Sequence, residues 1–298
     1  MIRTRRVSAP SRGIGGVVAA EAWLPPVTGF PGTGADSTSD RWSGAELPDD
    51  RIRALAIGAY YGRDRDSYND TVAFLPELDG ATETRREQAI ERLHASWGVD
   101  DAAGARDTVG RLLAGLHAPL FTLVHPLAAA AAGSEVRVDH SGPDHREFLR
   151  TLSKFRGDDG GLDHDYDAWR QAIEFGIVDL LPRPLHTDAT AWDLARAVFV
   201  VRAAHTAGYL DEDESWTFLE AGLAQAQQHY RNWRQFAAGF LTGAVFRAAT
   251  RDLATVREQV MRRRKVVLGL QLRPSSPWRR VALHPGAPVY GISARHQF

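Results

Sequence analysis

The chain has 298 residues and a formal net charge of −1, and with 44% hydrophobic and 24% charged residues its composition is typical of a globular protein with a sizeable core. It contains no cysteine, which excludes disulfides, thiolate metal ligands and a cysteine nucleophile. Arginine supplies 34 of the 36 basic residues, and together with the abundance of alanine and glycine this indicates a GC-rich bacterial genome.

The net charge hides two regions of opposite sign. Residues 51–250 contain 29 acidic and 21 basic residues, whereas residues 251–298 contain 2 acidic and 10 basic residues. The longest apolar stretch, residues 118–132, is shorter than the roughly 18 residues that a membrane-spanning helix needs. Residues 1–22 lack the apolar run of a signal peptide, so we expect a cytoplasmic protein.

Residues 1–50 are rich in glycine, proline and serine without sustained periodicity, which predicts an irregular or disordered segment. A hairpin of two helices is predicted at residues 84–97 and 101–116, with Asp100 or Asp101 as the cap of the second helix. Another helix is predicted to begin near residue 51. Three more are predicted at residues 119–132, 143–155 and 166–181, before the prolines at 182 and 184.

Three further helices are predicted at residues 189–206, 212–230 and 233–249. Three residue pairs have the spacing of N-terminal capping pairs: Thr190 with Asp193, Asp211 with Glu214, and Asn232 with Gln235. Gly239 and Gly243 lie on one helix face, where small residues four apart allow another helix to approach closely.

A last helix is predicted at residues 252–264, and residues 265–298 are expected to form one or two short strands or a wrapped arm. The predicted fold class is therefore mainly α: a compact bundle of antiparallel helical hairpins, with an irregular N-terminus and a short irregular or β C-terminal extension. The predicted regions are an irregular segment, a helical domain, and a basic C-terminal helix with its extension, at residues 1–50, 51–250 and 251–298.

Aromatic motifs recur in a fixed order along the predicted helices. They are Trp192-Asp193-x-x-Arg196, Gly208-Tyr209 followed by an acidic turn and Trp216, and Tyr230-x-x-Trp233, with Ile57-Gly58-Ala59 and Trp97-Gly98-Val99-Asp100 before them. In these motifs the chain resembles the bacterial family called domain of unknown function 1266, over about residues 50–250 and most closely over residues 191–246. The resemblance implies a helical fold and brings no known reaction.

Asp193 and Arg196 are three residues apart and so share a helix face. Beside Trp192 they could bind an anionic or planar ligand through bidentate hydrogen bonds and stacking. The alternative, which we favour, is a structural salt bridge that holds the helix against Tyr230 or Trp233. The candidate ligand-binding residues are Trp192, Asp193, Arg196, Tyr209, Trp216, Tyr230 and Trp233, although core packing is the favoured role of the aromatic ones.

No metal or cofactor is expected. The acidic residues Asp163, Asp165, Asp167 and Glu174 imitate a calcium-binding loop, but Ala168 stands where its sharp turn requires glycine, so an acidic helix start is favoured. Two Asp-His pairs, 139–140 and 144–145, lie in a loop without metal-ligand spacing, and residues 11–16 lack the strand and lysine of a phosphate loop. No serine or threonine stands in a recognisable nucleophile motif.

The basic tail is a separate candidate site. Its cations could contact phosphate groups, with Trp278 stacking on a base, but we favour their pairing with the acidic helices of the same chain. These cations are Arg257, Arg262, Arg263, Arg264, Lys265, Arg273, Arg279 and Arg280.

The leading functional hypothesis is a non-catalytic protein-interaction or regulatory module, including a toxin-neutralising role. The first alternative is an enzyme or small-molecule binder that uses an Asp-Arg-aromatic pocket. The second alternative is nucleic-acid binding through the basic tail, which is not favoured because the body of the chain is acidic. No membrane partner is expected.

Overall fold

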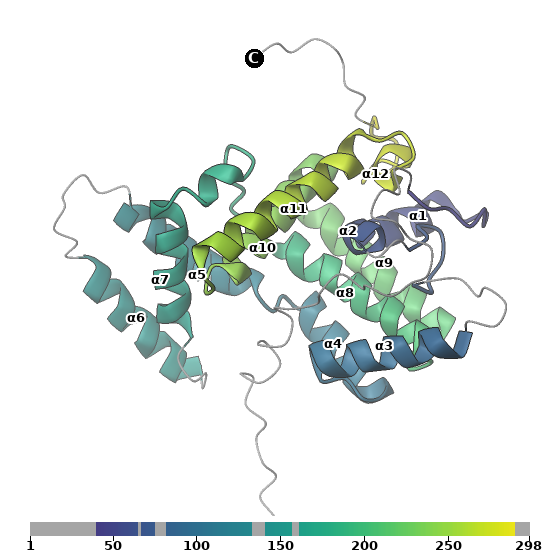
Figure 1. Cartoon of the computed structure of the whole chain (residues 1–298), viewed down its shortest axis with the longest axis horizontal. Helices are drawn as coiled ribbons and strands as arrows, with labels where there is room; N and C mark the ends of the chain where they lie inside the picture. The colour runs from purple at the N-terminus through teal and green to yellow at the C-terminus, as the bar shows by residue number, and fades with distance from the viewer. Residues whose placement is uncertain (1–39, 65–66, 75–81, 133–140, 157–160, 290–298) are drawn as a thin grey trace, which may run out of the picture.

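The structure is a computed structural model that describes residues 40–64, 67–74, 82–132, 141–156 and 161–289. Within these ranges the secondary structure is helical, with no β-strand. Figure 1 shows its helices. They are α1 (Asp49–Ala56), α2 (Ala59–Asp64), α3 (Thr82–Trp97), α4 (Ala102–Leu113), α5 (Ala118–Ala132), α6 (Ser141–Arg156), α7 (Leu162–Glu174), the 3-10 helix η3 (Val178–Leu180), α8 (Thr190–Thr206), α9 (Glu212–His229), α10 (Trp233–Ala248), α11 (Leu253–Leu272) and α12 (Pro277–Arg280). The predicted helical bundle is thus confirmed.

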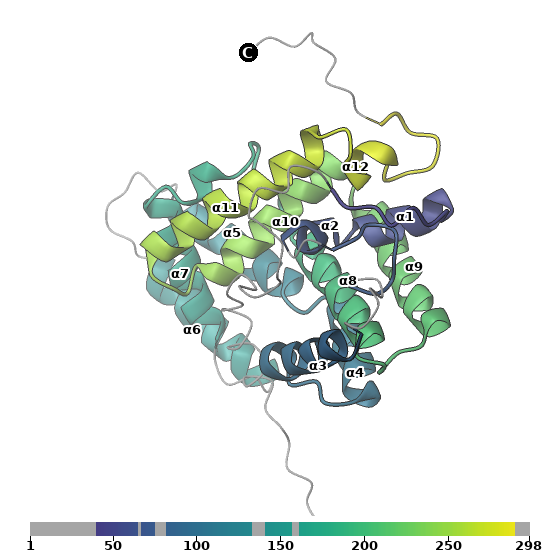
Figure 2. The same cartoon turned by 45° about the vertical axis from the view of Figure 1, so that its right-hand side comes forward.

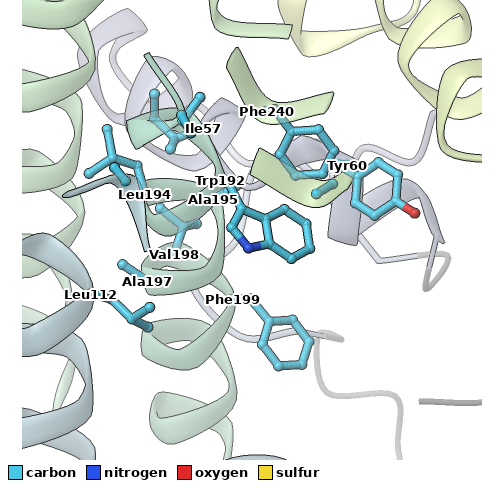
Figure 3. Packing of buried hydrophobic residues seen from close by; sticks show 14 of the residues in the cluster. Ile57, Tyr60, Leu112, Trp192, Leu194, Ala195, Ala197, Val198, Phe199 and Phe240 are labelled. Atoms are coloured by element: carbon cyan, nitrogen blue, oxygen red, sulfur yellow. The ribbon is translucent and has the colours of Figure 1, made fainter. Parts of the chain in front are cut away.

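Helix α8 is the centre of the fold. Every residue from Ala191 to Ala204 is buried, because α3, α4, α9 and α10 all pack around this helix. In Figure 3 the side chains of α8 meet those of Leu112 on α4, Phe240 on α10 and Ile57, which follows the last residue of α1. A helix that is apolar on nearly all sides, as α8 is, belongs in the interior.

Two glycines allow helices to approach α8 closely. A Cβ atom on Gly243 would lie 2.5 Å from Cβ of Trp192, and one on Gly58 would lie 2.5 Å from Cγ1 of Val198. Both separations are far below a normal carbon–carbon contact, so a larger residue would force the helices apart. The predicted close approach at Gly243 is confirmed.

Helices α5, α6 and α7 form a second group of packed helices, at one end of the molecule in Figure 1. The ring of Trp169 on α7 makes edge contacts with Phe121 on α5 and Phe246 on α10, at centroid distances of 5.5 and 5.7 Å. These aromatic contacts join the second group to the central bundle.

The C-terminal region is helical over a longer range than the sequence predicted. For residues 265–298 the sequence left two alternatives, short strands or a wrapped arm. Helix α11 continues to Leu272, so a strand at residues 265–272 is wrong, and Val267 and Leu270 extend the buried face formed by Val256 and Val260. The helix crosses α10 on the outside of the bundle (Figure 2).

Beyond α11 the chain packs back onto the core. Trp278 donates a hydrogen bond of 2.8 Å from Nε1 to the carbonyl oxygen of Ala56, and its ring stacks on Trp233 at 5.5 Å with an angle of 7° between the planes. Arg53 Nε donates to the carbonyl oxygen of Ala282 at 2.8 Å. The C-terminal segment is therefore an integral part of the folded core.

Capping was predicted correctly for three helices and wrongly for one. The side chains of Asp101, Asp211 and Asn232 accept hydrogen bonds from the first turns of α4, α9 and α10. At α8, however, Thr190 N–H donates to Asp188, and Asp193 does not cap its own helix. The carboxylate of Asp193 caps α5 instead.

Among the described residues, one stretch is long and apolar enough by length and composition to cross a membrane, namely residues 102–132. This stretch is two helices, α4 and α5, which are separated by a turn at Gly115 with a φ of +88°. A third of the most apolar 18-residue segment of this stretch is buried, and the core helices of soluble proteins can have the same length and apolar composition.

Candidate functional site: a buried Asp193–His117–Arg196 cluster

The carboxylate of Asp193, on α8, caps the N-terminus of α5. Its Oδ2 atom accepts hydrogen bonds from the backbone N–H groups of His117, at 2.7 Å, and Ala118, at 2.9 Å. These N–H groups lie at the start of a helix, where they have no partner within the helix and where the helix dipole favours a negative charge. Asp193 therefore fixes the position of α5 relative to the central helix.

The side chains of His117 and Arg196 complete the cluster. His117 Nδ1 lies 2.9 Å from Asp193 Oδ1 and 2.7 Å from Arg196 Nη1. A neutral imidazole with its proton on Nδ1 donates to the carboxylate, whereas the other tautomer accepts from the guanidinium. In either tautomer Arg196 Nη1 stays 3.5 Å from Asp193 Oδ1, so the cluster contains an ion pair.

Two indole rings lie on the guanidinium of Arg196. Its Cζ atom is 4.6 Å from the ring centroid of Trp97 and 5.5 Å from that of Trp192. Trp233, which the sequence suggested as a neighbour of this pair, stacks on Trp278 with a centroid distance of 5.5 Å. The side chains of Asp193, Arg196 and His117 are 0%, 3% and 4% exposed, so the cluster is closed to solvent.

Burial sets the charges of the cluster. Desolvation lowers the pKa of His117 to about 4, even though its hydrogen bond to Asp193 opposes this change. For Asp193, desolvation alone would raise the pKa, but the hydrogen bond and charge of His117 and the charge of Arg196 together lower it. At neutral pH the cluster is thus a carboxylate, a neutral imidazole and a guanidinium.

Some hydrogen-bonding capacity next to Arg196 is unused. The indole Nε1 atoms of Trp97 and Trp192 are buried and have no hydrogen-bond partner among the described residues. A buried N–H without a partner usually costs about 1–3 kcal/mol, so each is unusual in a folded core. Both indoles belong to the wall around the guanidinium.

The remaining predicted site residues do not join this cluster. Tyr230 is buried beside the start of α8, where its hydroxyl accepts from the N–H of Ala191 at 2.8 Å. Trp233 is buried under the C-terminal segment and donates from Nε1 to the carbonyl oxygen of Val281 at 2.8 Å. Both side chains are structural parts of the core rather than walls of the Asp193 cluster.

Trp216 and Tyr209 are also separate from the cluster. Trp216 is buried on α9, donates to Glu212 at 3.2 Å, and has the guanidinium of Arg51 at 4.4 Å from its ring centroid. Tyr209 is half-buried in the turn after α8 and packs against the core. The seven predicted residues therefore divide among several locations, and Trp192, Asp193 and Arg196 are the three that form the cluster.

Two polar residues of the core were missed by the sequence analysis. His117 gave no signal beyond its place two residues before Pro119, just ahead of α5. Arg202, on α8, is 1% exposed and donates to the carbonyl oxygens of Tyr68, Val72 and Ala73. Burial lowers the pKa of Arg202 to about 10, which leaves it protonated at neutral pH.

The acidic residues of the calcium-like run are paired with arginine. Asp163, Asp167 and Glu174 contact Arg150, Arg146 and Arg170 at 2.7–2.9 Å, and Asp165 lies 4.0 Å from Arg247. These residues belong to α7 and its first turn, as an acidic helix start requires. No group of three or more metal-ligating side chains is found among the described residues.

Other minor predictions are resolved in part. His145 lies 3.2 Å from the hydroxyl of Tyr166, whereas Asp139, His140 and residues 11–16 lie outside the described residues. In the tail, Arg263 and Arg280 lie over the rings of Trp192 and Trp42, at 5.7 and 4.2 Å from the centroids.

The fold and its closed polar cluster define an all-α protein organised around one buried helix. A family model described as protein of unknown function (DUF1266) matches residues 92–283, and the chain belongs to this family. The match extends past residue 250, so α11 and α12 are family elements, and it begins after the Ile57-Gly58-Ala59 motif. No curated protein and no solved structure matches the chain.

Proposed function

We propose that the chain is a non-catalytic helical module that binds another protein. The observation that carries this proposal is the closure of the Asp193–His117–Arg196 cluster, whose side chains are at most 4% exposed. A reaction site needs polar groups that a substrate can reach, usually in a concave pocket. A closed cluster supports a structural role for the family motif and directs attention to the surface.

Large apolar side chains on the surface support the same proposal. Isolated exposed apolar residues are normal, but a group of them on one rigid element is typical of an interaction surface. Within the described residues they concentrate on α6 and α11, with one after α7 and one near the C-terminus: Phe148, Phe155, Phe175, Met261, Leu268, Leu272 and Val289.

The test is the state of the full-length chain isolated at its native expression level. A tagged chain should elute in a complex of fixed stoichiometry with one other protein, as measured by light scattering and mass spectrometry. An isolated 32.8 kDa monomer without a stoichiometric partner would contradict the proposal. For a toxin-neutralising role in particular, co-expression of the chain with the recovered partner should restore growth that the partner alone suppresses.

Small-anion binding beside Arg196 is a second candidate, and the two unpartnered indole N–H groups favour it. Because the cluster is closed, an anion would reach Arg196 only through local opening of the core, and it could then accept from an unpartnered indole N–H. The candidate predicts that a simple carboxylate or phosphate raises the melting temperature of the wild type and not of Trp192→Phe, which removes one donor. No shift across a panel of such anions would exclude it.

A further inference from the structure

Helix α11 lies on the outside of the bundle with one face in the core. Val256, Val260, Val267 and Leu270 are buried, and the helix packs on α10, α2 and α12. Figures 1 and 2 both show α11 running across the outer side of α10. Several side chains on its outer side are exposed.

The outer face of α11 has an apolar stripe at its centre. Met261, Leu268 and Leu272 are 50%, 53% and 45% exposed. With about 3.6 residues per turn, these three positions fall within an arc of about 40° around the helix axis. The centre of this arc lies about 135° around the helix from the centre of the buried face, so the stripe points away from the protein core.

Cationic side chains border the stripe on both sides. Arg257 and Arg264 lie on one side and Lys265 on the other, and all three are exposed without an ion pair among the described residues. The one acidic residue of α11, Glu258, is exposed on the same side of the stripe as Lys265, so the five basic residues of the helix make the side of Arg257 and Arg264 the more positive one. The outer face is thus amphipathic in its own right, with an apolar centre and a positive border.

We propose that this face of α11 binds an acidic amphipathic helix of a partner protein. This proposal rests on the proposed function and specifies its partner chemistry. Spacings of seven and four residues along the stripe match the ridge of a packed helix, whose apolar side chains would lie on Met261, Leu268 and Leu272. Glutamate or aspartate beside that ridge would meet the cationic border.

Charge argues against occupants from the chain itself. A second copy that packed α11 against α11 would place Arg264 and Lys265 near the same cations of its partner, which is repulsive. Residues 1–39, which lie outside the described ranges, contain four arginines and two acidic residues. Their net charge is therefore positive and would be repelled by the cationic border.

Charge and side-chain type also argue against a nucleic acid or a membrane. The apolar side chains occupy the centre of the face and the cations its border, whereas phosphate recognition needs the cations at the contact. The stripe has no aromatic anchor of the kind that interfacial helices use. The body of the chain, residues 51–250, has eight more acidic than basic residues and would be repelled by both surfaces.

The first experiment places the photo-crosslinking amino acid p-benzoylphenylalanine at Leu268 in the full-length chain, in its native host. The control carries it at Phe155 on α6, which is 89% exposed. The proposal expects a cross-link from position 268 to one protein, mapped by mass spectrometry to an acidic helical segment. A cross-link from position 155 alone would overturn this inference and leave the proposed function intact, whereas recovery of no partner from either position would contradict both.

The second experiment tests the charge and the stripe separately in the complex with the cross-linked partner. The double variant Arg264→Glu with Lys265→Glu should weaken binding at least about tenfold, and the wild-type affinity should fall as salt is raised. Leu268→Ser should also weaken it at least about tenfold, whereas the control Phe155→Ser should not change it. Unchanged binding by either α11 variant would overturn the proposal.

A third measurement separates the classes of partner. Wild-type chain is titrated with a synthetic helical peptide bearing leucines at the stripe spacing and flanking glutamates, with phosphatidylserine vesicles, and with a short DNA duplex. Binding to the peptide that exceeds binding to its lysine-flanked version supports the inference. Preferential binding to the vesicles or the duplex would overturn it, as would dimerisation that Leu268→Ser abolishes.

Discussion

Acidification from pH 6.5 towards pH 4 should destabilise the protein through His117. The pKa of His117 is about 4 in the folded chain, against 6.5 for an ordinary histidine. Because the pKa of His117 is lower in the folded chain than in the unfolded chain, the unfolded chain takes up a proton more readily. The contribution of His117 to the free energy of unfolding is therefore fully present above pH 6.5 and is lost as the pH falls towards 4. At about 1.4 kcal/mol per pH unit, the loss by pH 4 is about 3 kcal/mol.

The groups that face His117 do not reverse this sign. Asp193 attracts the imidazolium and Arg196 and Arg247 repel it, while burial is the largest influence on its pKa. The pKa of Asp193 is itself lowered, so its carboxylate remains charged over most of this range and any protonation at its lower end destabilises the fold in the same direction. The pKa values of His125, Asp188 and Glu214 are lowered as well, so the part of the pH dependence that His117→Asn removes is the part assigned to His117.

The assay is urea unfolding at pH 7 and at about pH 4, on the wild type and on His117→Asn. Asparagine keeps a neutral donor near Asp193 and cannot take up a proton in this range. The wild type should lose about 3 kcal/mol more than the variant over this interval. The exposed histidine at position 164 gives a matched control, His164→Asn, which should behave as the wild type. An equal loss in the free energy of unfolding between pH 7 and pH 4 for the wild type and His117→Asn would refute the reasoning.

Three substitutions test other parts of the core by the free energy of unfolding in urea. Asp193→Ala leaves Arg196 buried without its carboxylate and should cost about 3–5 kcal/mol, and a cost below about 1 kcal/mol would contradict a closed ion pair. Gly243→Ala forces a methyl group into Trp192 and should cost about 1–3 kcal/mol; an unchanged midpoint would show that the helices separate easily. Trp233→Phe removes a buried hydrogen bond to the C-terminal segment and should cost about 1–2 kcal/mol, so unchanged stability would mean that this segment is not fixed to the core.

The helices could be predicted because their determinants are local. Caps at Asp211 and Asn232 are read from the first turn of each helix, and the close approach at Gly243 follows from the absence of a side chain. The end of α11 could not be read in this way. Val266-Val267-Leu268 has the β-branched composition of a strand, and its helical state depends on the packing of Val267 against residues far away in the sequence.

The polar cluster depends even more strongly on contacts between residues that are far apart in the sequence. Asp193 has the local spacing of a cap for α8, but its carboxylate accepts from His117 and Ala118, 75 and more residues earlier in the chain. Sequence spacing predicted that Asp193 and Arg196 lie together, and they do. It could not identify His117, because the contact between α8 and the start of α5 is created only by the tertiary fold.

The cluster and the surface of α11 place different demands on the chain. Removing one member of a closed ion-pair cluster leaves a buried charge without its partner, so these positions tolerate little change whatever the protein binds. An exposed face such as that of Met261, Leu268 and Leu272 contributes little to folding, so its side chains can change at little cost in stability. The Asp193–Arg196 pair is thus part of the scaffold, and under the proposed function the residues that select a partner should be sought on the outer helices.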